Sequence, residues 1–294
     1  MKVINIGSLN IDKVYTVDHF VSRGETLASE KLEFYTGGKG LNQSVALSLA
    51  GVSVLHAGMI GEDGLFLKQY LASQGVDTNL IRVTDGVSGH AVIQVDREGQ
   101  NCILLYGGAN KMFTKEFIDE VLDEGEEGDI LLLQNEVNGL GYIMEEAHKR
   151  GMRIAFNPSP ADEGLKALPL ELVSWFILNE TEGHILTGES IPEDVLEKMA
   201  KFYPASEIVL TLGKEGAVVC SSGTLYRHGI YSVNTVDTTA AGDTFTGYYL
   251  ASAMSGKKIE ECIETASKAA ALAVSRKGAA PSIPKPEDIR CFFG

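Results

Sequence analysis

The sequence lacks the features that mark several broad classes of protein. Only four cysteines occur among 294 residues, and no two of them have the Cys-x-x-Cys spacing of a zinc or redox site. We expect them to be free thiols in a reducing compartment. No apolar run approaches the ~18 residues of a membrane span, and the apolar stretch at the N-terminus is too short for a signal peptide. These absences argue against a disulfide scaffold and a membrane protein, and they favour a cytoplasmic protein.

Positive charge is also scarce. Lys and Arg number 25 against 40 Asp and Glu, so the net charge is −15. An acidic chain repels polyanions, and we therefore expect neither nucleic acid nor an anionic membrane as a partner. Any phosphate site must be local. Because the 44% hydrophobic and 22% charged fractions are ordinary for a globular protein, the length is compatible with one large α/β domain.

Several common catalytic and nucleotide-binding motifs are missing. Gly38-Lys39 is followed by Gly40, so no GxxxxGK[ST] loop exists, and Gly7 does not open a GxGxxG after the first strand. The HExxH and GxSxG patterns are absent as well, and the six histidines are scattered. A Walker P-loop, a Rossmann dinucleotide site, a zinc protease and a serine hydrolase are therefore not expected.

Short apolar segments alternate with helical patterns along most of the chain. This alternation is typical of a parallel sheet whose crossover helices cover both faces. We predict a three-layer α/β/α fold with a mostly parallel, doubly wound sheet. The predicted strands are residues 3–6, 54–60, 130–133, 153–156, 175–178 and 208–212, and helical patterns cover residues 41–49, 117–122, 246–254 and 259–274.

Two pairs of strand-like segments have no helix between them. They are residues 13–20 with 26–35, and 89–96 with 101–106. We predict that they form a small separate sheet, built from insertions at about 11–36 and 87–107 into a single domain spanning 1–294. Such a sheet would project from the strand ends where α/β proteins bind ligands, so it is expected to act as a lid.

The first glycine-rich motif is Gly37-Gly38-Lys39-Gly40-Leu41-Asn42, directly before a predicted helix. Glycines at such a junction let the backbone approach a ligand closely, and an asparagine can bind hydroxyls. On its own, the motif is equally compatible with a simple turn from strand to helix.

The second motif is Asp237-Thr238-Thr239-Ala240-Ala241-Gly242-Asp243, again before an apolar helix. Small residues at a helix start leave backbone N–H groups open, which makes an anion hole at the positive end of the helix dipole. Asp243 would then be placed to take a proton from a hydroxyl beside the bound anion. The structural alternative is that Asp243 only favours the first helical turn.

Both motifs fall where predicted strands meet loops or helices, and so do several other polar segments. An open α/β sheet builds one site from many strand ends. We therefore expect one site from the following segments: Asp12, 38–42, 179–182, 211–213 and 240–243.

At this level of detail the sequence resembles the ribokinase-like sugar kinases. The similarity runs from residues 7–12 to residues 276–282. The family's N-terminal signature corresponds to residues 37–44 with Gly51 and Gly61, and its Asp-Thr-x-Ala-Ala-Gly-Asp signature to residues 237–243. The resemblance implies ATP-dependent transfer of a phosphoryl group to the primary hydroxyl of a furanose sugar, with D-ribose as the first candidate.

The resemblance also implies residue roles. Asp243 would be the catalytic base, and the amides of Ala240, Ala241 and Gly242 would form the anion hole. The residues implied to hold the sugar are Asn10, Asp12, Gly38, Lys39, Asn42 and Glu136. Those implied to line ATP are Asn179, Thr211, Gly213, Gly216, Gly242 and Ser267.

Two metal ions follow from the same resemblance. Asn179 and Glu182 would help to place Mg²⁺ through water. A monovalent cation, K⁺, would lie beside the anion hole. Its implied ligands, mostly backbone carbonyls, are Asp237, Thr239, Ala273, Arg276, Gly278 and Ser282. The family often pairs two lids, so we expect a homodimer, and an isolated small sheet with free edges favours the same expectation.

Three departures and two alternatives remain. Tyr248 stands where the family has Gly or Ala, Ser267 where it has His or Asn near adenine, and residues 22–25 lack the usual lid proline. The acceptor could instead be a nucleoside, fructose, deoxyribose or a keto-deoxy sugar acid. A non-catalytic sugar- or nucleotide-sensing protein would keep the fold, but it fits poorly with an intact Asp243, Gly242 and Glu182.

Overall fold

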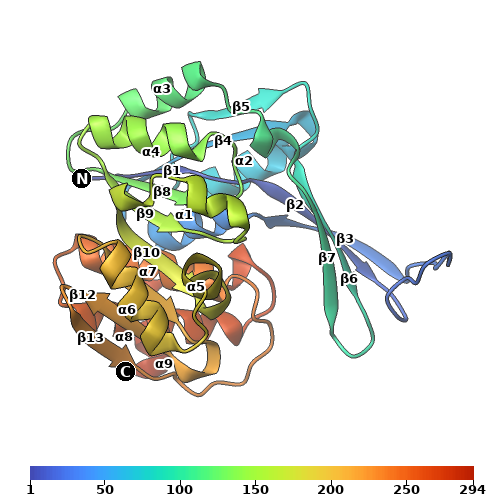
Figure 1. Ribbon diagram of the computed structural model, residues 1–294. Helices are drawn as coiled ribbons and strands as arrows, with labels where there is room; N and C mark the ends of the chain where they lie inside the picture. The colour runs from blue at the N-terminus through green and yellow to red at the C-terminus, as the bar shows by residue number, and fades with distance from the viewer.

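The computed structural model describes residues 1–294 and is built around a nine-stranded sheet (Figure 1). Only β12 runs antiparallel to its neighbours, so the prediction of a mostly parallel sheet is confirmed. Across the sheet the strands are β13 (Thr224–His228), β12 (Ala217–Ser221), β11 (Glu207–Thr211), β10 (Val173–Asn179), β9 (Arg153–Asn157), β8 (Ile130–Gln134), β1 (Val3–Ile6), β4 (Val54–Gly61) and β5 (Ile81–Thr84).

Helices cover both faces of this sheet. Successive residues of a strand point to opposite faces, and accordingly Val3 lies in one hydrophobic core whereas Ile4 and Ile6 lie in the other. The three-layer prediction is therefore confirmed. One face carries α3 (Lys115–Asp123), α4 (Leu140–Lys149), α5 (Glu180–Thr187) and α6 (Pro192–Phe202), and the other carries α1 (Lys39–Leu49), α2 (Leu65–Ser73), α7 (Ala241–Met254), α8 (Ile259–Val274) and α9 (Pro286–Phe293).

Local sequence explains where several helices begin and end. Thr114 caps α3, since its hydroxyl accepts a hydrogen bond from the Phe117 amide at 3.3 Å. Gly188 ends α5 in the left-handed conformation that glycine adopts without strain. The α8 bounds match the predicted 259–274. Helix α7 begins at Ala241, upstream of the predicted residues 246–254. It cannot begin earlier, because Ala240 has a φ of 60°, outside the right-handed helical region.

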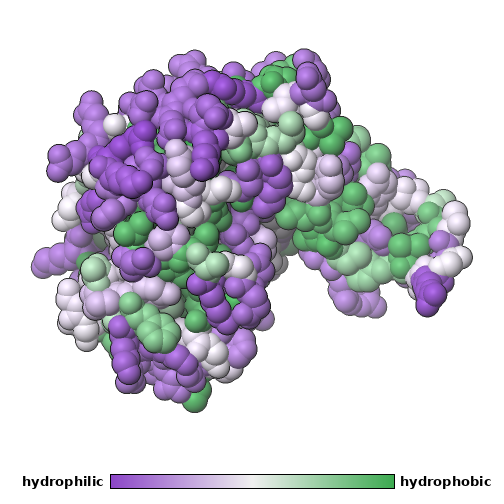
Figure 2. All heavy atoms as spheres, turned by 45° about the horizontal axis from the view of Figure 1, so that its top comes forward, coloured by the Kyte–Doolittle hydropathy of each residue, from purple (hydrophilic) through white to green (hydrophobic).

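A second sheet projects from the body of the molecule (Figure 1). Its strands, in order, are β3 (Lys31–Gly37), β2 (Asn10–Thr16), β6 (Gly89–Val95) and β7 (Asn101–Tyr106). The β6–β7 turn is held by Asp96, whose carboxylate accepts hydrogen bonds from the amides of Glu98 and Gln100, both at 2.9 Å. The predicted small sheet is confirmed. Figure 2 shows apolar side chains along it.

No helix in the structure combines the length and the hydropathy that a membrane span requires.

Candidate active site

The predicted site residues gather at the carboxyl edge of the parallel strands. Gln134, Asn157, Asn179 and Thr211 are the last residues of β8, β9, β10 and β11. A cavity of about 230 Å³ opens at this edge. It is lined by Lys39, Asn157, Ser159, Ile177, Leu178, Asn179, Glu182, Thr211, Thr238, Ala240, Ala241, Gly242, Asp243 and Thr246.

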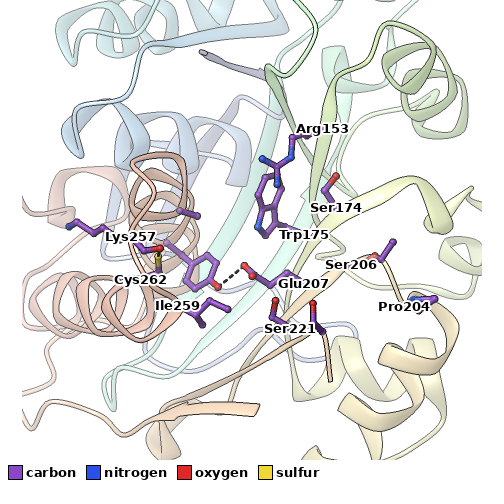
Figure 3. Close-up of a pocket in the computed structure, with 14 residues that line it drawn as sticks. Arg153, Ser174, Trp175, Pro204, Ser206, Glu207, Ser221, Lys257, Ile259 and Cys262 are labelled. Atoms are coloured by element: carbon purple, nitrogen blue, oxygen red, sulfur yellow. Dashed lines mark hydrogen bonds between the residues drawn. The ribbon is translucent and has the colours of Figure 1, made fainter. Parts of the chain in front are cut away.

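A larger hollow of about 460 Å³ lies at the opposite, amino edge of the sheet (Figure 3). Arg153 and Glu207, the first residues of β9 and β11, face it, and Glu207 accepts a hydrogen bond from the Tyr249 hydroxyl at 2.8 Å. It is lined by none of the predicted site residues, so the smaller cavity is the candidate active site.

The start of α7 presents open backbone donors to the cavity. The amides of Ala240, Gly242 and Asp243 have no acceptor in the structure, whereas the Ala241 amide donates to the Thr238 carbonyl at 3.3 Å. A side chain at position 242 would point into open space, since nothing lies within 4 Å of an added Cβ. Open amides at the positive end of a 14-residue helix favour an anion.

Asp243 is buried beside these amides and is held by two amide side chains from α1. Its Oδ2 accepts a hydrogen bond from Asn42 Nδ2, and its Oδ1 accepts one from Gln43 Nε2, both at 2.9 Å. The Asn42 Oδ1 atom is buried without a partner. A hydroxyl placed next to Asp243 could therefore donate to Asn42 as well.

The glycines of the first motif allow the backbone to pack closely. Gly38 has a φ of +99°, and a Cβ at Gly40 would lie 2.4 Å from the Ser8 amide nitrogen. This close approach sets the start of α1 against the loop after β1. Glu136 links the loop after β1 to the start of α1, because it accepts hydrogen bonds from the Ser8 hydroxyl and, at 3.1 Å, from the Lys39 amide.

Two carboxyl groups lie near each other beside the small sheet. Burial, aided by the charge of Glu136, raises the pKa of Asp12 to about 7. Burial likewise raises the pKa of Glu136, against the opposing hydrogen bond from Ser8. Asn10 is buried next to them and accepts a hydrogen bond from Asn110 Nδ2 at 2.7 Å. These groups can recognise hydroxyls of a polar ligand under the small sheet.

Lys39 supplies positive charge to the cavity. Burial alone would lower its pKa, but the charges of Asp243, Glu136 and Glu182 outweigh burial and raise the pKa. Lys39 is therefore a cation at neutral pH, close to the carboxyl groups of Asp243, Glu136 and Glu182.

Asn179 and Glu182 form a capping box at the start of α5. The Glu182 amide donates to Asn179 Oδ1 at 3.0 Å, and Glu182 in turn accepts hydrogen bonds from the Asn179 amide and side chain. No cluster of three or more carboxylate, histidine or cysteine groups suited to a metal occurs in the structure. The Glu182 carboxylate lines the cavity. A single carboxylate fits Mg²⁺, because this ion keeps several waters and binds through few protein ligands.

Asp237 ties together the two loops that were predicted to bind K⁺. Its carboxylate accepts hydrogen bonds from the Thr239 amide and hydroxyl and from the Gly278 amide. Burial would raise its pKa, but these bonds lower it, so the group stays ionised. An anionic carboxylate and nearby carbonyls are oxygen donors of the kind that alkali cations bind. Some predicted donors already have partners, since the Ala273 carbonyl accepts from the Arg276 amide at 3.0 Å and Ser282 donates to Ala279.

Other predicted ATP-binding residues lie outside the cavity lining. Gly213 and Gly216 form the turn between β11 and β12, and a Cβ at Gly216 would lie 2.0 Å from the His228 carbonyl oxygen. Gly216 therefore has a structural reason to be glycine. Ser267 is buried on α8. Its contact with adenine stays a prediction, as do the roles of the two glycines.

Sequence reasoning missed several polar residues that the fold brings to the site. Gln43 contacts Asp243, Asn110 contacts Asn10, and Asn157 and Ser159 line the cavity. Gln43 was visible as the residue after the first motif. Asn110 lies in a short turn and Ser159 in a loop, and neither had a local signal in the sequence.

The family follows from comparison with known proteins. The model of the pfkB family carbohydrate kinases matches residues 1–286, and the chain belongs to this family. The resemblance predicted from the motifs is confirmed, and the protein is an ATP-dependent carbohydrate kinase.

Three relatives define its neighbourhood within the family. The chain is 34% identical over 297 residues to a ribokinase of Haemophilus influenzae, with 98% of this chain and 97% of the relative covered. It is 30% identical over 305 residues to a deoxyribokinase of Salmonella typhi, with 100% and 99% covered. The structure of Arabidopsis thaliana ribokinase complexed with ribose and ATP superposes with a TM-score of 0.86 at 28% identity, covering 99% of this chain and 97% of that one.

Proposed function

We propose that this kinase transfers the γ-phosphoryl group of MgATP to the primary hydroxyl, O5, of D-ribose. The observation that carries the proposal is the pairing of open amides at the start of α7 with the buried carboxylate of Asp243. The relatives named ribokinase, which match nearly the full chain, support ribose as the acceptor.

Phosphoryl transfer asks a protein mainly to align the reactants and to neutralise charge on the transferred group. The amides of Ala240, Gly242 and Asp243 meet that charge at the positive end of α7. Asp243 takes the proton from the acceptor hydroxyl, a contribution of about 10²–10⁴-fold in rate. Lys39, a cation between the carboxyl groups, offsets the negative charge of the phosphates. Mg²⁺ bound through Glu182 and Asn179 would neutralise phosphate oxygens.

Sugar recognition falls to side chains of the small sheet, of α1 and of the loop after β8. Asp12, Asn10 and Glu136 pair with hydroxyls of the sugar, and Asn42 contributes its free carbonyl oxygen. A sugar that lacks one of these hydroxyls leaves a buried polar group of the protein without a hydrogen-bond partner, which costs binding energy. The small sheet closes over the sugar and excludes water.

A second acceptor, 2-deoxyribose, is favoured by the full-length similarity to a deoxyribokinase. It shares O5 with ribose, so the same phosphate machinery serves both sugars. The two candidates differ only in the hydroxyl at carbon 2.

The test is a coupled assay of ADP release with ribose, 2-deoxyribose, fructose and a nucleoside panel. We expect the highest kcat/KM with ribose. Asp243→Asn should lower kcat by at least about 10²-fold while sugar binding stays within a few-fold. A higher kcat/KM with another acceptor would replace ribose. Absence of turnover with every acceptor would leave the sensing alternative, and unchanged kcat in Asp243→Asn would remove the proposed base.

The small sheet is also the proposed homodimer interface. Leu32, Phe34, Ile103, Leu104 and Tyr106 of β3 and β7 are exposed, Leu104 by 72%, and the apolar surface of this sheet is visible in Figure 2. Two-sided exposure of apolar strands is unusual in water, and a second copy would cover it. Sedimentation should give a dimer that Leu104→Asp converts to a monomer. A monomeric wild-type protein at micromolar concentration would refute the interface.

A further inference from the structure

The carboxylate of Asp243 is the end point of a chain of buried amide side chains that lies behind the site. The chain begins at Gln43, whose Nε2 donates to Asp243 Oδ1 at 2.9 Å and to Asn157 Oδ1 at 3.2 Å. Gln43 is fully buried and does not line the cavity, so it faces the base rather than a ligand. Asn42 differs in that its carbonyl oxygen is buried and has no hydrogen-bond partner.

The orientation of the Gln43 amide is set by the next two residues. Its Oε1 accepts a hydrogen bond from Gln134 Nε2 at 2.8 Å. The second hydrogen of Gln134 Nε2 goes to Asn5 Oδ1 at 3.1 Å. Both hydrogens of Gln134 are therefore used, and the Gln43 oxygen is drawn away from Asp243.

The chain ends in a neutral histidine. Asn5 Nδ2 donates to the Gly40 carbonyl and to Ser44 Oγ, both at 2.8 Å, so the Ser44 proton is left for His56 Nδ1, also at 2.8 Å. Burial lowers the pKa of His56 to about 3, so the ring is neutral near neutral pH and its Nδ1 can accept this proton. Each side-chain amide hydrogen of Gln43, Gln134 and Asn5 thus has one acceptor, and reversing one of these amides would oppose two donors or two acceptors elsewhere.

We propose that Gln43 is a positioning residue for Asp243, itself oriented by Gln134 and Asn5. A carboxylate turns readily about its χ2 bond, because that torsion is broad and roughly two-fold. With one amide donor on each oxygen, the plane of the Asp243 carboxylate is fixed. The lone pair that meets the acceptor hydroxyl is then in place before the sugar binds, which lowers the cost of alignment during transfer. This inference rests on the proposed role of Asp243 as the base.

A hydrogen bond donated to a carboxylate also favours its ionised form. Removing Gln43 should therefore change two properties together: the orientation of the base, read in kcat, and its ionisation, read in the acid limb of the pH profile. A residue that only supported the fold would change the free energy of unfolding without moving that limb.

The main variant is Gln43→Met, which has similar size and no donor. We expect kcat to fall about 10- to 100-fold, since a misplaced reacting group costs about this much. The acid limb of kcat should move to higher pH, and KM for ribose and MgATP should stay within about three-fold. Gln134→Met keeps the hydrogen bond from Gln43 to Asp243 but leaves the Gln43 amide free to turn. The fall in kcat should therefore be smaller than in Gln43→Met and in the same direction.

Gln43→Glu is the conservative test. When protonated, this carboxyl can donate to Asp243 and still accept from Gln134, as the glutamine does. When ionised, it repels Asp243. Activity of Gln43→Glu should therefore exceed that of Gln43→Met at acidic pH and fall towards or below it as the pH rises.

Asn138→Leu is the matched control, because Asn138 is a partly buried amide bonded only to the Phe113 backbone. It should lower the melting temperature and leave kcat and its pH profile unchanged. An unchanged kcat and acid limb in Gln43→Met, or equal pH profiles for Gln43→Glu and Gln43→Met, would overturn the proposal. If Gln43→Met does not fold, an unchanged kcat in Gln134→Met has the same meaning. Failure of the proposed function would look different, since wild-type protein would then release no ADP with any sugar.

Discussion

Gly37→Ala tests whether the small sheet holds the sugar through Asp12. Gly37 is the last residue of β3 and pairs with Asn10 of β2, two residues before Asp12. A Cβ at position 37 would lie 2.2 Å from Asp12 Oδ2 and 2.4 Å from its Cγ and Oδ1. These separations are far inside van der Waals contact. The carboxyl group of Asp12 must therefore rotate away from its position over the site.

The size of the effect follows from what Asp12 contributes. A hydrogen bond to a charged group is worth about 1.5–3 kcal/mol, and each 1.4 kcal/mol is a factor of ten in binding. We expect the ribose KM to rise by about 10- to 150-fold, with KM for MgATP unchanged because the proposed nucleotide site lies at the other motif. The ADP-release assay gives both constants, and calorimetric titration gives the ribose affinity directly.

Gly229→Ala is the control, since an added Cβ there meets nothing within 4 Å. It should behave as wild type in both assays. A ribose KM within three-fold of wild type in correctly folded Gly37→Ala protein would refute the placement of the sugar against Asp12.

Three further predictions concern the same site. Burial raises the pKa of Asp12 in the folded state to about 7 from its ordinary value of 3.8, so its contribution to stability is complete below about pH 4 and is lost as the pH rises through 7. The melting temperature of Asp12→Asn relative to wild type should therefore be higher at pH 8 than at pH 5, and an equal difference at both would refute the shift. Gly247→Ala would place a Cβ 2.4 Å from Ala46 Cβ, where α7 packs on α1; it should destabilise the fold by about 1–3 kcal/mol in urea titrations and lower kcat, because Asn42 and Gln43 move relative to Asp243. Replacing Na⁺ with K⁺ should raise kcat, with Asp237→Ala abolishing the difference, and activity indifferent to the cation would contradict a K⁺ site at these loops.

The fold could be predicted where burial dictates the sequence. Strands β1, β4 and β8–β11 are covered on both faces and are therefore continuous apolar runs, which made them visible. Strands β5, β12 and β13 were missed. Strands β5 and β13 are short and carry exposed polar residues at the margin of the sheet, whereas β12 is buried. For β3, the strand begins at Lys31 rather than at Thr26, since residues 26–30 have no regular partner on β2. Hydrogen-bonded pairing with the neighbouring strand, rather than local composition, decides where such a strand begins.

The site divides in the same way between local and distant signals. The proposed phosphate recognition uses backbone amides, and open amides need a continuous run of small residues, so residues 240–242 were recognisable in the sequence. The proposed sugar recognition and the support of Asp243 use side chains, which can come from distant parts of the chain that meet at the same edge of the sheet. Gln134, Asn110 and Asn157 are separated along the chain and share no motif. Only the parallel register of β8 and β9 beside β1 brings Gln134 and Asn157 to Gln43. A substitution in the sheet that shifts this register by one residue would therefore remove the support of Asp243 while leaving both sequence motifs intact.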